Sequence, residues 1–377
     1  MVDYVNGIAE DFEDIIDFGN YAFGIDFKKL LPKLYSGKID TSSHHFLVKD
    51  NNKIKGMVGC FPLELNVINT TLKVKGIGTV SVHPYSRDKG YMKQLMNNAI
   101  NEMKAESIDF AILNGQRQRY EYFGFTPTGS QIIFEVNQSN IRHKKSKFES
   151  KVSLKRFEEL SENELKNIYI LHNKQSVHGS RDFNSFIDVC KSWSSNPFGI
   201  YTEDKLAGYI ILSEGYDSVQ EIYLEDYEIL VNLLSNIMKS FNKGKIDVIV
   251  AVHRQLLKAN LENICESYKI EQNTCLNVFN YKNFIKAFLG LKSSYEMLEK
   301  GQLVIEIVDI EKIIINVDED ITVESSESFP QVKLSHLEAM NFLCSSLRPI
   351  MHESLEINRL IKSWFPLPFF FPGIDNV

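Results

Sequence analysis

Cysteine is scarce in this sequence, and metal-binding spacings are missing. The cysteines are odd in number, scattered and never arranged as C-x-x-C: Cys60, Cys190, Cys265, Cys275 and Cys344. Such usage excludes a zinc knuckle and is typical of buried or idle thiols in a reducing compartment. No group of His, Cys and acidic residues has the spacing of metal ligands. The sequence therefore predicts no metal site.

Long apolar runs are also missing. No stretch approaches the ~20 apolar residues that a membrane-spanning helix needs. The N-terminus, MVDYVNGIAEDFEDII, carries acidic residues where a secretory signal would carry cations followed by an apolar run. These absences predict a cytoplasmic protein with no membrane span and no export signal.

Positive charge is not in excess. The net charge is −7, with 44% apolar and 24% charged residues, which is ordinary for a folded soluble protein. A duplex nucleic acid requires a basic face, so this balance argues against nucleic acid as a partner. At 377 residues, the chain is long enough for two or three domains.

Strand-like and helix-like segments alternate along the chain. A region that reads as helices up to about Tyr35 is followed by strand patterns, and a helical stripe of apolar residues begins at Tyr91. A short apolar strand (109–115) and one more strand (131–136) come next. This alternation predicts an α/β or α+β layered fold.

The middle of the chain repeats the layout of the first part. Residues 198–214 follow the same order as residues 45–61: a strand, an acidic and polar turn, and a strand with a central glycine, Gly208 in place of Gly56. Residues 139–156, between the copies, are basic and polar without periodicity, which favours a solvated linker over a basic patch for RNA or phosphate. The sequence predicts two copies of one fold.

The last hundred residues have another pattern. Alternating strands are followed by a helix that opens with a capping box, Ser335 and Glu338. The chain ends in WFPLPFFFPGIDNV (364–377), which carries so much apolar surface that we expect it to be docked against the protein.

The segment from Thr79 to Met96, TVSVHPYSRDKGYMKQLM, joins a strand to a helix through R-D-K-G. A glycine at such a junction lets backbone N–H groups approach an anion that the helix dipole also favours. Arg87 and Lys89 add positive charge, and Gly90 removes the side chain where the backbone comes closest. No Walker lysine and no G-x-G-x-x-G precede it. The junction predicts a pyrophosphate site, although a plain structural turn is the common role of such junctions.

The second copy has lost this site. Glu225, Asp226 and Glu228 occupy the equivalent junction and would repel a diphosphate. One copy therefore binds the anion, and the other is predicted to be scaffold.

The pattern V-x-V-x-P-x-x-R-x-x-G, formed by Val80, Val82, Pro84, Arg87 and Gly90, resembles the acetyl-CoA motif of GNAT N-acetyltransferases. The whole layout is similar to the enhanced-intracellular-survival (Eis) branch. That resemblance implies two tandem GNAT folds, the second degenerate, and a C-terminal α+β domain like sterol carrier protein. The implied domains are 1–150, which binds acetyl-CoA and is catalytic, 151–285, which is degenerate, and 286–377, whose tail docks towards the active site.

The same resemblance assigns roles to residues. Backbone groups of Val80–Val82 would line the pantetheine arm, and N–H groups of Asp88–Lys93 would hold the pyrophosphate. Tyr120 would be the general acid, and the C-terminal carboxylate of Val377 the general base. The implied cofactor-binding residues are Val80, Ser81, Val82, Arg87, Asp88, Lys89, Gly90, Tyr91, Met92, Lys93, Gly115 and Gln116.

The base has alternatives in the sequence. The strand before the junction contains no acid, so Glu64, one strand earlier, is an internal candidate, and Asp375 lies close to the end of the chain. The tail is equally consistent with a packed anchor whose carboxylate is idle. Tyr122 and Phe123 are expected to be core residues, and Arg119 to be solvated or to bind a phosphate. Phe18, Phe23 and Phe27 are candidates for the wall of an acceptor pocket, although helix packing is the expected role for them.

These residues predict an acetyl-CoA-dependent N-acetyltransferase that transfers directly to the amine of a small molecule or peptide, since no cysteine lies near the motif with a histidine partner. A tyrosine is protonated at neutral pH and can supply the proton that the leaving thiolate needs. Two alternatives stay open: a non-catalytic acyl-CoA-binding protein, and a protein that binds a hydrophobic ligand in its last domain. A homo-oligomer is expected from the resemblance alone.

Overall fold

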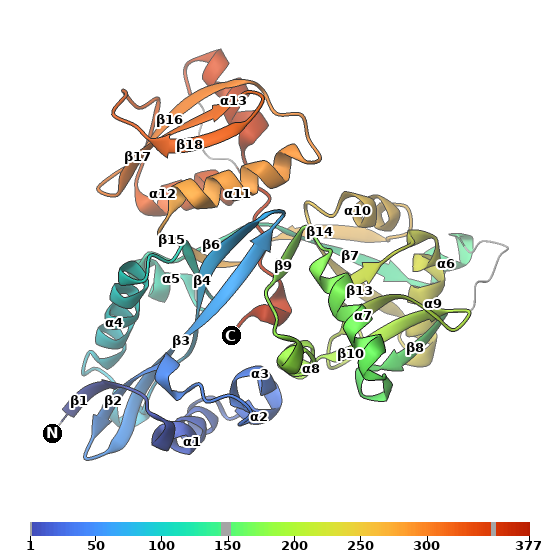
Figure 1. Ribbon diagram of the computed structural model, residues 1–377, viewed down its shortest axis with the longest axis horizontal. Helices are drawn as coiled ribbons and strands as arrows, with labels where there is room; N and C mark the ends of the chain where they lie inside the picture. Colours follow the sequence, from blue (N-terminus) through green and yellow to red (C-terminus); the bar gives the residue numbers. More distant parts are fainter. Residues whose placement is uncertain (1, 145–151, 348–351) are drawn as a thin grey trace.

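The structure is a computed structural model that describes residues 2–144, 152–347 and 352–377. It contains three sheets, each covered by helices (Figure 1). Among the residues described, none of the helices combines the length and the apolar character that crossing a bilayer requires.

The first sheet forms the core of the first unit. Its strands, in spatial order, are β1 (Val2–Asn6), β2 (His45–Asp50), β3 (Lys53–Val67), β4 (Thr70–Val82), β5 (Phe110–Leu113), β15 (Thr274–Val278) and β6 (Thr126–Thr128), with β9 (Val177–Gly179) paired to β3. Neighbouring residues of β2 point to opposite faces, as strand geometry requires. Phe46 therefore packs under α4 (Tyr91–Ala105), whereas Leu47 packs under α1 (Phe12–Phe23).

The helices of the first unit begin and end where local sequence dictates. The buried side of α1 carries Ile15, Ile16 and Phe18. The helix is capped by Gly24, whose φ of 68° lies in the left-handed region that glycine adopts without strain. Two short helices, α2 (Phe27–Leu30) and α3 (Pro32–Tyr35), complete this layer. After β5 comes the short helix α5 (Arg117–Tyr120).

The second sheet repeats the arrangement. Its order is β14 (Ser267–Glu271), β7 (Gln131–Asn137), β13 (Lys245–Ala251), β12 (Ser218–Leu224), β11 (Lys205–Leu212), β10 (Asn196–Thr202) and β8 (Val152–Arg156). One face packs against α6 (Gln138–Lys144), α9 (Leu230–Ser240) and α10 (Gln255–Glu262), and the other against α7 (Glu162–Asn173) and α8 (Phe186–Lys191). An antiparallel β10-β11-β12 meander, a helix and a parallel β13 match β2-β3-β4, α4 and β5.

The third sheet belongs to the C-terminal unit. Its order is β18 (Ile321–Ser325), β17 (Glu311–Val317), β16 (Gly301–Ile307) and β19 (Val332–Leu334), with helices α11 (Tyr281–Ser293), α12 (His336–Cys344) and α13 (Leu355–Trp364). The capping box predicted at Ser335 is present, because its N–H donates to Glu338 Oε2 at 2.8 Å. Helix α11 shares one core with the first sheet and the third.

Two strands lie in the sheet of the other unit. β7 precedes residue 150 in sequence but pairs with β13 and β14 of the second sheet. Conversely, β15 comes late in the chain but is inserted between β5 and β6 of the first sheet. The limit predicted at 285/286 falls within α11, so the domain limits stay predictions, while the units themselves are tied together by shared strands.

Two expectations for local structure were wrong. The N-terminal region does not begin as a helix, because Val2–Asn6 pairs with β2 as an edge strand. A strand of five residues is too short for an alternation of apolar and polar residues to be recognised in the sequence. The described part of the segment expected to be a linker is ordered, since α6 ends at Lys144 and β8 covers Val152–Arg156.

A buried histidine makes the fold sensitive to acid. His45 is 1% exposed, and its ring nitrogens lie 2.9 Å from the Thr41 carbonyl and 3.0 Å from the Tyr35 hydroxyl. Burial lowers the pKa of His45 from 6.5 to about 4. The unfolded chain therefore binds a proton that the folded chain refuses between these pH values, and stability falls as the pH falls from 6.5 to 4.

We predict that His45→Gln weakens this acid sensitivity. As the pH is lowered from 6.5 to 4, the free energy of unfolding should decrease less in the variant than in the unmodified protein. The difference between the two decreases should be about 3 kcal/mol. Urea titrations at pH 7, 5.5 and 4.5 measure the slope. Parallel slopes for the two proteins would contradict the assignment.

Candidate active site

The free edge of β4 begins where β5 ends. The parallel pairing of the two strands stops at Ile77 and Leu113, whereas β4 continues to Val82. Its pairing with β3 shifts register between Met57 and Gly59, and the opposing Thr79 has a φ of 49°. This bulge turns the strand away from β5. Backbone groups on that edge, beyond Ile77, are thus placed to pair with an extended ligand.

The loop after β4 leads into the N-terminus of α4. Pro84–Ser86 forms a 3-10 turn, and Gly90 precedes the helix with a φ of 75°. The Gln94 N–H donates to the Gly90 carbonyl at 3.1 Å. The N–H groups before Gln94 precede this first helical bond and have no partner inside the helix, which is the general condition for binding an anion at a helix N-terminus.

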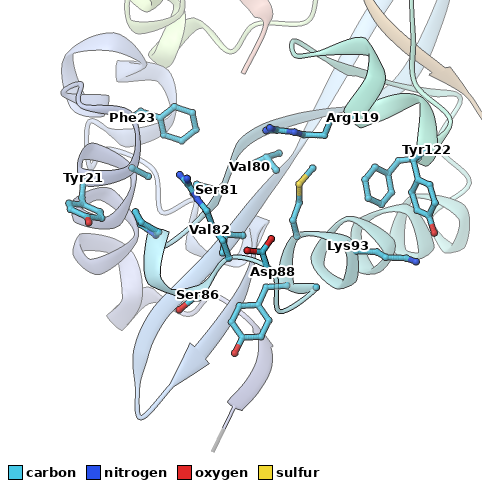
Figure 2. Close-up of a pocket in the computed structure, with 17 residues that line it drawn as sticks. Tyr21, Phe23, Val80, Ser81, Val82, Ser86, Asp88, Lys93, Arg119 and Tyr122 are labelled. Carbon is cyan, nitrogen blue, oxygen red and sulfur yellow. The ribbon is translucent and has the colours of Figure 1, made fainter.

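A cleft of about 960 Å³ opens at this junction (Figure 2). Most of the residues predicted to bind the cofactor line it: Val80, Ser81, Val82, Arg87, Asp88, Gly90, Tyr91, Met92 and Lys93. Three cationic side chains, Arg87, Lys93 and Arg119, border the cleft, against the single carboxylate of Asp88. The junction therefore combines an unpaired strand edge, a helix N-terminus and positive charge.

Three of the residues predicted to bind the cofactor do not line the cleft. The Lys89 ammonium lies 5.9 Å from the centre of the Tyr91 ring. Gly115 faces Tyr120, because a Cβ at Gly115 would be 2.4 Å from Tyr120 Cε2. Gln116 is the residue before α5. The structure therefore gives Gly115 a packing role and leaves Lys89 and Gln116 beside the cleft rather than in its wall.

Tyr120 is the last residue of α5, and its side chain is buried against the core formed by β4, β5 and α4, with 6% exposure. Burial raises the pKa of its hydroxyl, and the neighbouring Arg119 opposes that shift. Arg119 itself points into the cleft (Figure 2). The phenol is thus protonated at neutral pH and lies next to a residue of the cleft wall, although Tyr120 does not line the cleft itself.

Sequence reasoning favoured a packing role for the aromatic residues that it named among those forming the walls of the cleft. Tyr122 and Phe123, expected in the core, line it, and the Lys93 ammonium lies 4.9 Å from the centre of the Tyr122 ring. Tyr21 and Phe23, at the end of α1, form the opposite wall. The sequence raises Phe23 as a wall of an acceptor pocket but favours helix packing for it, and it contains no signal for Tyr21, because α1 reaches the cleft only through packing on the far face of the sheet.

The C-terminal residues lie in a trough whose floor consists of glycines. A Cβ at Gly76 would lie 2.4 Å from Val377 Cγ2, and a Cβ at Gly78 would lie 3.0 Å from the carboxyl carbon of Val377. On β9, a Cβ at Gly179 would lie 2.5 Å from Asp375 Oδ2. The tail can take this path only because these positions lack side chains. It brings the terminal carboxylate to Gly78, two residues before Val80, where the part of β4 that lines the cleft begins, whereas Val377 itself is not among the lining residues.

Both units hold the tail. From α3, the Lys33 ammonium donates to the carbonyls of Ile374 at 2.7 Å and Asn376 at 2.5 Å. From the second unit, the Trp193 indole N–H donates to the Asn376 carbonyl at 3.1 Å. Burial lowers the pKa of Lys33 to about 7, against the opposing effect of Asp375.

The alternative bases are placed less favourably. Glu64 is exposed and lies five residues along β3 from Gly59, the partner of Gly78, which is roughly 17 Å at the rise of a strand. Asp375 is buried, and its two oxygens accept hydrogen bonds from Arg181 at 2.8 and 3.1 Å. Of the three carboxylates, only that of Val377 lies against the bulged part of β4.

Residues 5–128 match the acetyltransferase (GNAT) domain family. The matched range contains the free β4 edge, the loop and α4, so the GNAT-like unit is the one that carries the cleft. No curated protein matches the chain in sequence.

Solved structures extend the likeness over the whole chain. Eis1 from Mycobacterium abscessus covers 100% of both chains with a TM-score of 0.67 and 11% identity. A GCN5-related N-acetyltransferase from Anabaena variabilis ATCC 29413 also covers 100% of both, with a TM-score of 0.70 and 15% identity. A probable N-acyltransferase from Enterococcus faecalis V583 covers 91% of this chain and 89% of its own, with a TM-score of 0.65 and 17% identity.

At these identities the likeness shows a shared fold. The predicted fold class, two tandem GNAT-like folds followed by a C-terminal α+β unit, is therefore confirmed. The resemblance of the last unit to sterol carrier protein stays a prediction.

We predict that Gly76→Ala displaces the tail, because the new methyl group would collide with the Val377 side chain. The environment of Trp193, which holds Asn376, should become more polar. Tryptophan emission should shift to longer wavelength, and the shift should disappear in a Trp193→Phe background.

The matched control is Gly244→Ala, where a Cβ meets no atom within 4 Å. Its emission should equal that of the unmodified protein. An unshifted spectrum for Gly76→Ala, with the melting temperature also unchanged, would contradict the close contact between Gly76 and Val377.

Proposed function

We propose that this protein is an acetyl-CoA-dependent N-acetyltransferase that moves an acetyl group directly to a primary amine. The observation that carries the proposal is the meeting of two features on one strand. The free edge of β4 leads into the N-terminus of α4, and the terminal carboxylate lies against Gly78 of the same strand. Family match and site geometry support the same chemistry.

The residues at the junction fit coenzyme A as a co-substrate. The backbone of Val80–Val82 would pair with the amides of the pantetheine arm in the manner of a strand. The N–H groups at the start of α4, with Arg87 and Lys93 nearby, would hold the pyrophosphate. Acetyl-CoA supplies the thioester, which is an activated acyl group.

Two groups of the chain would handle the protons. The Val377 carboxylate would accept a proton from the acceptor ammonium, directly or through water, so that the neutral amine can attack the thioester carbonyl. Tyr120 would give its proton to the leaving thiolate, since its raised pKa keeps the phenol protonated. No side chain of the protein becomes covalently acetylated in this scheme.

The aromatic walls favour an acceptor with an apolar part. Tyr21 and Phe23 come from α1, on the side of the cleft away from α4, and both are partly exposed there. An amine that carries an alkyl or aromatic group would cover these rings. The acceptor is thus proposed only as a class, and the expected homo-oligomer and sterol-carrier-like last unit stay predictions.

Binding of coenzyme A should depend more on Arg87 than on Lys89. Arg87 lines the cleft, whereas the Lys89 ammonium lies over Tyr91. Arg87→Gln should weaken binding roughly tenfold, the usual effect of losing a charge-assisted hydrogen bond. Lys89→Gln should weaken it less. Calorimetric titration with coenzyme A at low and high salt measures both, and equal losses would contradict the placement of the two cations.

The reaction is tested by free-thiol release from acetyl-CoA in the presence of a panel of primary amines. Release should require both enzyme and amine. Tyr120→Phe should lower kcat by roughly 10²- to 10⁴-fold, the usual range for loss of a general acid. The matched control is Tyr268→Phe, an exposed tyrosine of β14 in the second sheet, which should be unchanged.

The base is tested by removing Val377. Activity should fall, and it should be restored in part by isovalerate, which is valine without its amino group. Isovaleramide has the same shape without the charge and should not restore it. Bound coenzyme A without turnover for any amine would instead favour an acyl-CoA-binding protein.

A further inference from the structure

The second unit has lost the anion-binding junction but contacts the tail at a buried ionic site. Figure 1 shows the C-terminus between the first unit and the segment that contains β9 and α8. Arg181 follows β9, and its side chain is 1% exposed. Its guanidinium Nε lies 2.8 Å from Asp375 Oδ1, and Nη2 lies 3.1 Å from Asp375 Oδ2.

The other side of the guanidinium is fixed by the second sheet. Arg181 Nη1 and Nη2 lie 3.1 and 2.6 Å from the oxygens of Glu221 on β12. The Tyr209 hydroxyl donates to the same carboxylate at 2.6 Å. Although burial opposes ionisation, Arg181 and His172 hold the pKa of Glu221 below its usual value. Contacts within the second unit therefore fix the Arg181 side chain independently of its contact with the tail.

The tail adds a second carboxylate to this cluster. Arg181 faces two carboxylates, Glu221 from the second sheet and Asp375 from the tail. The Lys33 ammonium is close enough to Asp375 for the carboxylate to act on its pKa. Arg181, Lys33 and the carboxylates of Glu221 and Asp375 thus meet where the units and the tail join. Breaking a buried pair by removing one partner is strongly destabilising, so the tail is fixed in one position.

We propose that Arg181 is a positioning residue that holds the Val377 carboxylate at the active site through Asp375. This inference rests on the function proposed above. Only one residue separates Asp375 from Val377, and its carbonyl is held by Lys33 and Trp193. The geometry leaves the last residue little freedom other than to lie against Gly76 and Gly78. The second unit therefore serves catalysis by ordering the chain end.

Positioning of this kind affects rate more than binding. A base displaced by about 1 Å can lower a rate by roughly 10²-fold, whereas the cofactor contacts on β4 and α4 are not altered. The expected signature is a lower kcat with a nearly unchanged KM for acetyl-CoA. A merely structural role for Arg181 would lower the melting temperature without this separation.

The decisive variant is Asp375→Asn, which keeps the size of the side chain and leaves Arg181 paired with Glu221. Its kcat should fall roughly 10- to 100-fold, with the KM for acetyl-CoA within about twofold. Trp193→Phe, which removes one hydrogen bond to the tail, should show a smaller change in the same direction. Both variants are checked by thermal melting, since the pair is buried.

Tail position is measured without using activity. A carboxypeptidase should release valine slowly from the unmodified protein and faster from Asp375→Asn. The matched control is Asp182→Asn, the same change at the exposed residue next to Arg181, which accepts the Asn184 N–H and does not contact the tail. Its kcat and its valine release should equal those of the unmodified protein.

The outcomes separate this inference from the proposed function. Faster valine release together with a lower kcat is the expected result. Unchanged valine release in Asp375→Asn would overturn the role of Arg181 in holding the tail. Faster release with an unchanged kcat would overturn the positioning role, because the tail would then move without consequence for the reaction. If the unmodified protein acetylates no amine, the proposed function fails, and valine release still decides whether Arg181 holds the tail.

Discussion

The contact between the chain end and three glycines is the constraint on which the arrangement of the units depends. Gly76 and Gly78 of β4 and Gly179 of β9 leave room for Val377 and Asp375, and a side chain at any of them would occupy the same space. The glycines lie on strands that also pair with the rest of the first sheet. Because the trough is part of the sheet, the tail is ordered by the fold itself rather than by a separate binding loop.

The same tail joins all three units. Upstream of the trough, Phe369 packs against Phe110 of the first sheet and against Phe284 and Phe288 of α11, and it thereby fills space between the first unit and the last. Further along, Asp375 pairs with Arg181 of the second unit. Exchange of β7 and β15 between the two larger sheets adds a second link that cannot be undone without breaking strand pairs.

The two copies of the fold show how one arrangement serves two purposes. In the first copy, the strand–helix junction is open and cationic, with Gly90 before α4. In the second copy, Asp226 caps the 3-10 turn at the same place by accepting the Glu228 N–H, and exposed acidic residues surround it. Charge alone would therefore exclude a diphosphate there. The second copy instead places Arg181 and Trp193 on the tail, on the side that faces the first unit.

The sequence by itself predicted most of the elements and the strand–helix junction at which an anion is expected. Period-2 and period-3.6 patterns, the capping box at Ser335 and the spacing from Val80 to Gly90 are local signals, since each depends on residues a few positions apart. They sufficed to predict the strand–helix junction, the repeat of the fold and the docked character of the tail.

Tertiary structure alone decided which distant residues meet. No local pattern could place Tyr21 on the cleft or decide that Phe23 lines it rather than packing among helices. Nor could it assign β7 and β15 to the opposite sheets or show that Gly115 accommodates the ring of Tyr120. Nor could it pair Arg181 with Asp375, which are 194 positions apart. These contacts arise when whole layers pack against one another. The residues next to each partner in the sequence do not indicate which distant residue it will contact.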